Sequence, residues 1–242
     1  MAAKVQRYKH DLEVSYALGA TLTYELVNCA PELVLRIFIS SSTEETDGIR
    51  KLLDRCARLG IPVERNDKAF NILSPKGNCF VIGEFKKVQG RISQGMHLVL
   101  VNPSDAGNLG TIIRTAVGFG IRNIAVIRPA VDFYDPKVIR ASMGAAFHVT
   151  IEYFDHIGRY RERFPENNLY AFMLSSSTPL TEIKKAEPWS LVFGNEAAGL
   201  PEEYKDFCRT VIIRHSGDID SLNLPMAAGI AMYEFTKDIW SP

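Results

Sequence analysis

Short apolar runs recur along the second half of the chain and alternate with segments of helical periodicity. Strands that are covered on both faces of a sheet read as near-continuous apolar runs, so this pattern predicts an α/β fold with a mostly parallel sheet. The predicted strands are residues 97–101, 123–127, 148–152, 169–174, 190–193 and 210–213. Helices are expected between these strands.

Capping residues locate three of the helices in this half of the chain. The first runs from about residue 110 to 119 and ends at Gly120. The second has Asp135 as its N-cap and Pro136 in its first turn. The last extends from about residue 222 towards residue 240.

The first 80 or so residues follow a shorter α/β pattern, near the low end of independent domain sizes. The expected elements are a helix over 15–28, a strand over 33–39, a helix over 47–59, a strand over 61–64, a short helix from Asn66 and a strand over 79–82. The helix over 47–59 is expected to end at Gly60. A polar, glycine-bearing stretch over 85–96 follows and marks a boundary. We therefore expect two domains, residues 1–90 and residues 91–242.

The charges of the chain balance. There are 28 Lys and Arg against 28 Asp and Glu in 242 residues, so no overall basic field marks the chain as a nucleic-acid binder. Two local patches are candidates: the basic residues of 86–91, and the arginines of 159–163 with Tyr160 and Phe164 among them. Taken alone, a solvated linker and an exposed helix face explain both patches.

Neither a membrane segment nor a metal site is predicted. No apolar stretch approaches the roughly 20 residues of a membrane helix, and the N-terminus lacks the apolar centre of a signal peptide. We therefore expect a cytoplasmic protein with reduced cysteines. The cysteines and histidines show no metal-ligand spacing, so no metal is expected.

Three polar segments follow predicted strands in the second half of the chain. They are Asn108 to Arg114, Gly194 to Leu200 and Ser221 to Asn223. Ligands of α/β proteins bind where loops leave the carboxyl ends of strands. We therefore expect the three segments to converge on one crevice.

The first segment combines a helix start with an arginine. Asn108 lies where backbone N–H groups can receive an anion, and Arg114 lies further along the helix. This combination is typical of a phosphate or oxyanion site. A helix cap and a surface ion pair explain the same two residues if the segment is taken alone.

The second and third segments carry a glycine, a carboxylate and amide or hydroxyl groups. Gly194 directly follows an apolar run, where a glycine permits the close approach of a flat ligand or forms a tight turn. Glu196 is expected to hold an arginine or to cap a helix. Asp220 or Ser221 is expected to cap the last helix, with Asn223 in its first turn.

Together these segments resemble the signature motifs of the SPOUT superfamily, in particular the TrmH or SpoU family of RNA 2′-O-ribose methyltransferases. The matches are N-x-G-x-I-x-R at 108–114, G-x-E-x-x-G-L at 194–200 and S-L-N at 221–223. The stretch 140–147 also resembles the family's arginine and S-x-G-A segment. The resemblance covers Met96 to the C-terminus, whereas residues 1–90 are only generally similar to the small L30e-like substrate-binding domain that often precedes it.

The resemblance implies a cofactor, a reaction and a set of site residues. S-adenosyl-L-methionine would bind in a deep C-terminal trefoil knot, an exception to the rule that chains avoid threading, with Gly194, Ile213 and Leu222 around the adenosine. Arg114 would stabilise the oxyanion that develops on a ribose 2′-hydroxyl, because a guanidinium hardly deprotonates in proteins. The residues expected to orient Arg114 and the ribose are Asn108, Glu196, Ser221 and Asn223. Arg140 would grip an RNA phosphate, and rRNA is favoured over tRNA.

Members of this family are homodimers that pack through the knotted domain. The resemblance therefore implies that part of the apolar last helix, which carries Met226, Ile230, Met232 and Phe235, forms a dimer interface. One departure from the family concerns the entrance loop. Family members commonly show D-P-x-N-x-G, whereas this chain has extra residues between Pro103 and Asn108.

Four other functions compete with ribose methylation. The strongest is a non-catalytic RNA-binding or regulatory protein that retains the SPOUT fold. A base methyltransferase of the same superfamily would lack the paired motifs described above. A hydrolase built on His215, Ser216 and Asp218 would lack the glycines of a nucleophile elbow, and a Rossmann-type methyltransferase would need a G-x-G loop that neither domain has.

Overall fold

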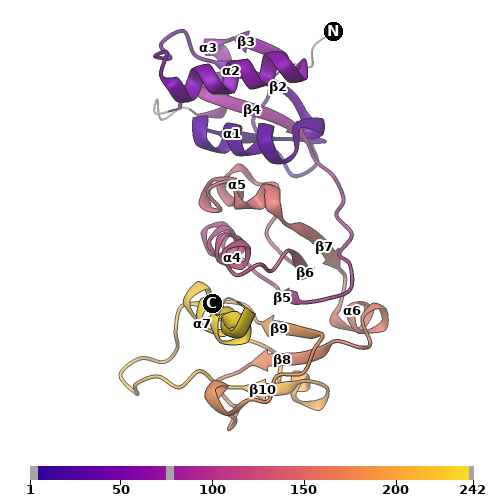
Figure 1. Ribbon diagram of the computed structural model, residues 1–242. Coiled ribbons are helices and arrows are strands. Elements are labelled where there is room, and N and C mark those ends of the chain that lie inside the picture. The colour runs from indigo at the N-terminus through magenta and orange to yellow at the C-terminus, as the bar shows by residue number, and fades with distance from the viewer. Residues whose placement is uncertain (1–4, 75–78, 240–242) are drawn as a thin grey trace. The chain divides into compact units, whose positions relative to one another are not determined.

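The computed structural model describes residues 5–74 and 79–239, and their contacts divide the chain into two compact units. The N-terminal unit is Met1–Val88 with Asp132–His148, and the C-terminal unit is Gln89–Val131 with Val149–Pro242 (Figure 1). The predicted division at residue 90 assigns Asp132–His148 to the second domain. In the structure this segment groups with the first unit instead.

A four-stranded mixed sheet forms the centre of the N-terminal unit. Its strand order is β1 (Val14–Leu18), β4 (Val81–Lys86), β2 (Val34–Ile39) and β3 (Val63–Arg65), and only β2 and β3 run parallel. The helices are α1 (Ala20–Cys29), α2 (Asp47–Leu59) and α3 (Asp67–Leu73), with a 3-10 turn η1 at Pro31–Leu33. Apolar clusters on the two sides of the sheet contain Ile37 and Val81 on one side and Phe38 and Ile82 on the other.

The helix predicted over residues 15–28 is wrong in its first part. Residues 14–18 form β1, which pairs antiparallel with β4, and α1 begins only at Ala20. Gly19 separates the two elements with a φ of 120°, a conformation that favours glycine. Consecutive residues of β1 are buried, so the strand lacks the alternation that would have distinguished it from a helix.

The predicted bounds of α2 and the predicted start of α3 are confirmed. Helix α2 begins at Asp47 after Thr46, whose hydroxyl accepts a hydrogen bond from the Ile49 amide at 3.3 Å. It ends at Gly60, which has a φ of 68°. Helix α3 is capped by Asn66, as its sequence position predicts.

The segment Asp132–His148 completes the N-terminal unit. It contains α5 (Pro136–Ala141) and the 3-10 turn η2 (Ala145–His148), and Asp135 caps α5 as predicted. Contacts with β1 and with the residues that follow β4 hold the segment in place. The Tyr134 hydroxyl donates to the Val88 carbonyl at 2.7 Å, and Lys87 pairs with Asp132 at 3.3 Å.

The C-terminal unit confirms the predicted parallel sheet. All six strands are parallel, in the order β10 (Arg209–Val211), β8 (Asn168–Phe172), β9 (Trp189–Phe193), β5 (His97–Val101), β6 (Asn123–Ile127) and β7 (Thr150–Phe154). The helices are α4 (Ala106–Gly118), α6 (Ile157–Arg163) and α7 (Leu224–Thr236), and the short turns are η3 (Leu180–Glu182), η4 (Glu202–Asp206) and η5 (Lys237–Ile239). The central strands β5 and β9 are almost fully buried, because both faces of the sheet are covered.

Helix ends differ most from the predictions. Helix α4 begins four residues earlier than expected, because the Asp105 carboxylate caps it by accepting from the Asn108 amide at 2.7 Å. Helix α7 begins at Leu224, so neither Asp220 nor Ser221 caps it. The predicted end of the last helix at Trp240 lies outside the described residues.

Helices α4 and α7 pack against each other (Figure 1). Two residues expected at a dimer interface, Met232 and Phe235, are buried inside the unit, whereas Met226 and Ile230 are exposed. Over the ranges that the structure describes, no helix has the length and apolar character needed to span a bilayer.

Candidate functional site

A cavity of about 220 Å³ lies at the carboxyl ends of β8, β9 and β10. This is the edge where ligands of parallel α/β sheets bind. Its walls come from four stretches of the C-terminal unit: the end of β8, the loop after β9, the chain after β10, and the start of α7. The lining residues include Phe172, Met173, Leu174, Gly194 to Gly199, Ile212, Ile213, His215, Ser221, Leu222 and Leu224.

Five of the residues singled out in the sequence line this cavity. Three of them, Gly194, Ile213 and Leu222, were assigned to the cofactor by resemblance. The other two are Glu196 and Ser221. Strands β8 and β9 are neighbours in the sheet, so the ends of both contribute to the wall. There Phe172 and Phe193 stack with ring centroids 4.5 Å apart, which makes this side of the cavity flat and apolar.

The glycine at position 194 serves the loop itself. A Cβ at Gly194 would lie 2.1 Å from the Gly199 carbonyl carbon, because the loop folds back on its own start. The backbones of Asn195 and Gly199 pair with each other, and Gly199 has a φ of 67°. A tight turn, one of the two expected explanations, therefore accounts for Gly194, although its backbone lines the cavity.

Glu196 joins this loop to the loop between β5 and α4. Its carboxylate accepts hydrogen bonds from the Ser104 hydroxyl at 2.9 Å and from the Ser104 and Asp105 amides at 3.2 Å each. The Asn108 side-chain amide also donates to it, at 3.3 Å. Glu196 therefore holds the start of α4 and does not cap a helix.

The ionised form of Glu196 is favoured. Burial acts to raise the pKa of this carboxyl, but hydrogen bonds from its own amide, Ser104 and Asn108 outweigh burial and leave the pKa below its usual range. The site therefore keeps a fixed negative charge at neutral pH.

Asn195 makes a second connection between the same two loops. Its side-chain amide donates to the Asn102 carbonyl at 2.8 Å, and its side-chain oxygen accepts from the Ala197 and Ala198 amides at 3.0 Å each. The extra residues between Pro103 and Asn108 therefore form part of an ordered junction. Their hydrogen-bond donors face Glu196.

Arg114 and Asn223 do not line the cavity. Arg114 is on the exposed stripe of α4, and within the described ranges its side chain makes no hydrogen bond or ion pair. Asn223 stands at the cap position of α7, yet its exposed side chain makes no capping bond. Pro225 in the first turn helps to set where α7 begins.

Arg140 belongs to the N-terminal unit. It lies in the last turn of α5, and its side chain is exposed. The structure thus brings Gly194, Glu196, Ile213, Ser221 and Leu222 together around the cavity and links Asn108 to them through Glu196.

The two basic patches are parts of the framework. In α6, Tyr160 and Phe164 are buried, Arg163 pairs with Glu152, and Arg161 lies 4.2 Å above the ring of Phe207. In the linker, Lys87 donates to the His10 carbonyl at 2.8 Å. Arg159 and Arg161 lie on an exposed helix face, as expected, whereas Lys87 and Arg163 are partly buried in ion pairs.

A hydrolytic triad is not formed by the residues after β10. His215 Nδ1 lies 3.1 Å from the Ile213 carbonyl oxygen, and neither Ser216 nor Asp218 shares a hydrogen bond with that ring among the described residues.

The residues missed by the sequence analysis are Ser104, Asn195 and the end of β8. The Asn-x-Ser-Asp pattern at 102–105, directly before a helix, could have indicated Ser104. The contribution of β8 could not be predicted in this way, because it depends on the order of the strands in the sheet.

Comparisons with known proteins agree with this geometry. A sequence model of the SpoU rRNA methylase family matches residues 95–233. An uncharacterized tRNA/rRNA methyltransferase of Synechocystis is 31% identical over 147 residues, which are 60% of this chain and 54% of that protein. A 23S rRNA (guanosine-2′-O-)-methyltransferase of Coxiella burnetii is 22% identical over 235 residues, 90% of this chain and 93% of its own.

A solved structure is similar over nearly the whole chain. The AdoMet-bound rRNA methyltransferase of Sinorhizobium meliloti has a TM-score of 0.80 and 26% identity, with 95% of this chain and 89% of that chain covered. The matched region contains all three motifs and the cavity that the second and third of them line. The chain belongs to the SpoU rRNA methylase family of RNA methyltransferases.

Proposed function

We propose that this protein, acting in the cytoplasm, transfers a methyl group from S-adenosylmethionine to a ribose 2′-hydroxyl of RNA, with rRNA favoured over tRNA. The observation that carries the proposal is the meeting of the second and third family motifs around one cavity, with the first motif joined to it by the Asn108–Glu196 hydrogen bond. The name of the Coxiella burnetii relative supports ribose methylation of rRNA.

The cavity suits a nucleoside cofactor. It combines apolar walls from Phe172, Leu222 and Leu224 with backbone groups at Gly194 and Ile213, the mixture that binds a flat base with polar edges. S-adenosylmethionine, when bound, supplies an electrophilic methyl group. We assign its adenosine part to Gly194, Ile213 and Leu222, and its cationic centre would be favoured by the charge on Glu196.

Arg114 is the residue proposed to act on the ribose. A 2′-hydroxyl that attacks a methyl group loses its proton to solvent or phosphate, and negative charge develops on the oxygen as the cofactor's carbon–sulfur bond breaks. A guanidinium stays protonated in proteins, so Arg114 stabilises that charge rather than acting as a base. The absence of bonds to its side chain among the described residues leaves it available for RNA.

The remaining polar residues would position Arg114 and the ribose. Glu196 fixes the first turn of α4 through Asn108, and α4 also carries Arg114. Ser221 and Asn223 offer an exposed hydroxyl and amide at the start of α7. These groups can donate to, or accept from, sugar and phosphate oxygens.

The N-terminal domain, residues 1–90, is proposed to select the RNA in the manner of an L30e-like domain, ahead of the methyltransferase domain, residues 91–242. Arg140 would bind an RNA phosphate, for which its exposed guanidinium is suited. A deep trefoil knot of the C-terminal chain is proposed to form the cofactor pocket, as the family resemblance implies.

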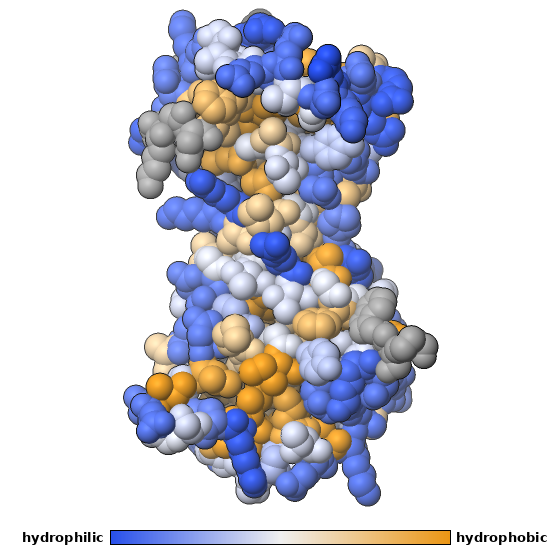
Figure 2. Space-filling model, turned by 60° about the vertical axis from the view of Figure 1, so that its left-hand side comes forward, coloured by the Kyte–Doolittle hydropathy of each residue, from blue (hydrophilic) through white to orange (hydrophobic). Residues whose placement is uncertain are grey.

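We further propose a homodimer that packs through α7. Apolar residues gather on one face of the C-terminal unit (Figure 2), and Met226, Ile230 and Tyr233 of α7 are exposed at helical spacing. Sedimentation should find a dimer, and Met226→Asp with Ile230→Asp should weaken it at least tenfold. Ile239→Asp is the control, because Ile239 is equally exposed on η5. A wild-type monomer at micromolar concentration would contradict this proposal.

Mapping of ribose methylation tests the enzymatic function. Total RNA from cells with and without the gene is compared, and RNA from the deletion strain is then incubated with purified protein and labelled cofactor. We expect one nucleotide to regain its 2′-O-methyl group. Arg114→Ala should reduce transfer by at least about 10²-fold, because one donor to a developing oxyanion is removed, with cofactor affinity retained.

Arg159→Ala is the matched control, since Arg159 is also an exposed helical arginine of the C-terminal unit. Its transfer rate should match that of the wild type. Cofactor binding without transfer to any cellular RNA would favour the non-catalytic RNA-binding protein instead. Loss of both cofactor affinity and transfer in Arg114→Ala would show that the role of Arg114 has been assigned wrongly.

A further inference from the structure

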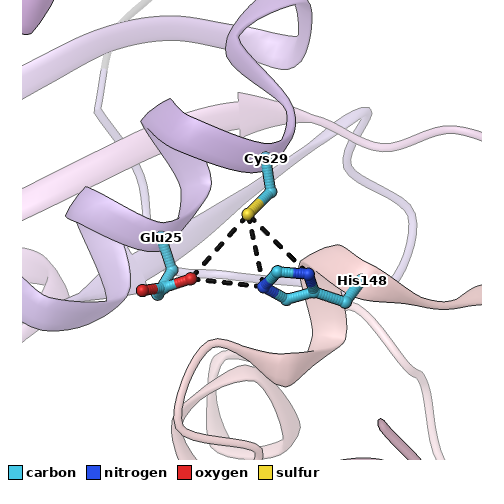
Figure 3. A group of neighbouring side chains, drawn as sticks. All are labelled: Glu25, Cys29 and His148. Atoms are coloured by element: carbon cyan, nitrogen blue, oxygen red, sulfur yellow. Dashed lines mark hydrogen bonds and ion pairs between the residues drawn. The ribbon is translucent and has the colours of Figure 1, made fainter. Parts of the chain in front are cut away.

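Glu25, Cys29 and His148 form a compact cluster in the N-terminal unit, outside the proposed active site. Glu25 and Cys29 lie one turn apart on α1, and His148 closes η2 (Figure 3). The three side chains point towards one another, and their ligand atoms all lie within 4.8 Å of each other.

The spacing of these atoms fits one metal ion. The closest pairs are His148 Nε2 and Glu25 Oε2 at 3.2 Å, Cys29 Sγ and His148 Nε2 at 3.3 Å, and Cys29 Sγ and Glu25 Oε2 at 3.8 Å. Zinc–ligand bonds of about 2.0–2.3 Å at a tetrahedral angle put ligand atoms about 3.3–3.6 Å apart. An ion therefore needs shifts of only a few tenths of an ångström in this cluster.

The ligand types select the class of ion. A thiolate, an imidazole and a carboxylate suit zinc and similar first-row divalent ions, whereas magnesium and calcium require oxygen ligands. Three protein ligands leave one coordination position open. His148 is 38% exposed at its side chain, so water can reach that position.

The backbone around the cluster is shaped to hold Glu25 in place. Gly144 has a φ of 91°, and a Cβ there would lie 2.7 Å from Glu25 Cγ. The next turn is fixed by Ser142, whose hydroxyl accepts from the Ala146 amide at 3.2 Å. His148, at the end of this turn, is thereby held opposite the carboxylate.

We propose that Glu25, Cys29 and His148 bind one zinc-class divalent cation. The ion would cross-link α1 to the segment Asp132–His148. These two parts of the N-terminal unit are far apart in the sequence, since Cys29 and His148 are separated by 119 positions. Because only the folded unit brings the ligands together, binding would stabilise the N-terminal unit. The proposal is independent of the methyltransferase reaction.

Cobalt substitution tests the site in the full-length protein. Chelator-treated protein is titrated with Co²⁺, which absorbs visible light, whereas Zn²⁺ does not. The thiolate-to-cobalt charge-transfer band is followed by absorption spectroscopy. We expect one equivalent to bind with a charge-transfer band that Zn²⁺ abolishes by displacement. The midpoint temperature of thermal unfolding should rise when Zn²⁺ is added.

Variants separate this site from incidental binding. Cys29→Ser should abolish the charge-transfer band, and His148→Gln should lower cobalt affinity by at least about tenfold. Cys79→Ser and His156→Gln are the controls and should behave as the wild type. Far-ultraviolet circular dichroism of each variant confirms folding. A missing band at saturating Co²⁺, or a band that persists in Cys29→Ser, would overturn the proposal.

Discussion

The C-terminal unit carries two polar networks at opposite ends of the same parallel sheet. At the carboxyl ends of the strands, Glu196 gathers donors from the loop before α4. At the amino ends, His97 of β5, Tyr160 of α6, Ser190 of β9 and Asn167 form a second network. The first of these borders the cavity that the family motifs line, and exposed polar residues lie beside it.

The network at the amino ends is closed. His97 Nε2 lies 2.6 Å from the Ser93 carbonyl oxygen, which can only accept, so Nε2 carries the proton. Nδ1 then accepts from the Tyr160 hydroxyl at 2.7 Å, and that oxygen lies 2.6 Å from Ser190 Oγ. Burial lowers the pKa of His97, which keeps the ring neutral and the network uncharged at neutral pH.

The network at the carboxyl ends is open. Ser104 and Asp105 are exposed although they donate to Glu196, and the neighbouring Ser221 and Asn223 are exposed as well. The Glu196 carboxylate is charged, and the Asn195 side-chain amide donates both to it at 3.3 Å and to the Ser104 hydroxyl at 3.2 Å. The difference teaches that a buried network with every group paired fixes the fold, whereas an exposed one with spare donors is available to a ligand.

Substitution of Glu196 should give the largest effect that separates the two networks. Glu196→Ala removes the acceptor that holds Ser104, Asp105 and Asn108, so the start of α4 and the cavity wall lose their alignment. We expect methyl transfer to fall by about 10²-fold, because small displacements of positioning groups have effects of that size. The free energy of unfolding should change by under about 1 kcal/mol, since water can replace the lost acceptor at these exposed groups.

Glu203→Ala serves as the control for this substitution. Glu203 is an exposed carboxylate of η4 in the same unit and does not line the cavity. Transfer kinetics and urea unfolding are measured on both variants. The proposed difference between the two networks would be contradicted by an unchanged transfer rate in Glu196→Ala, or by a loss of several kcal/mol in its free energy of unfolding.

Much of the sheet could be predicted from sequence, because its signals are local. In the buried parallel strands β5 and β9, the apolar runs 98–101 and 191–193 stand out between polar loops. The ends of α2 were equally readable, since Thr46 and Asp47 begin it and Gly60 ends it. Each of these features depends on neighbours within a few residues.

Features that depend on distant residues were not predictable. Strand β1 lacks alternation because it is buried on both faces, so its pattern merged with that of α1. The grouping of Asp132–His148 with the N-terminal unit follows from packing against β1 and Val88, which no local pattern encodes. The cluster of Glu25, Cys29 and His148 was not predicted, and no metal was expected, because Cys29 and His148 are 119 positions apart in the sequence.

The site was predictable in its motifs but not in its connections. The glycine, carboxylate and serine segments identified Gly194, Glu196 and Ser221, and all three line one cavity. The partners of Glu196 were not foreseen, because Ser104 and Asp105 precede it by more than 90 residues. Arg114 and Asn223 do not line the cavity, so their roles stay predictions that rest on the family resemblance.

Removal of the Tyr160 hydroxyl should give a smaller effect, on stability alone. Tyr160→Phe keeps the ring packed against Phe154 and Phe164, yet leaves His97 Nδ1 and the Ser190 hydroxyl without this buried partner. We expect the free energy of unfolding to fall by about 1–3 kcal/mol, measured by urea denaturation, with the transfer rate of the folded enzyme unchanged. Tyr233→Phe removes an exposed hydroxyl from the same unit and should leave stability within about 0.5 kcal/mol of wild type. A reduced transfer rate in folded Tyr160→Phe would mean that the two ends of the sheet are coupled and that the closed network is more than a framework.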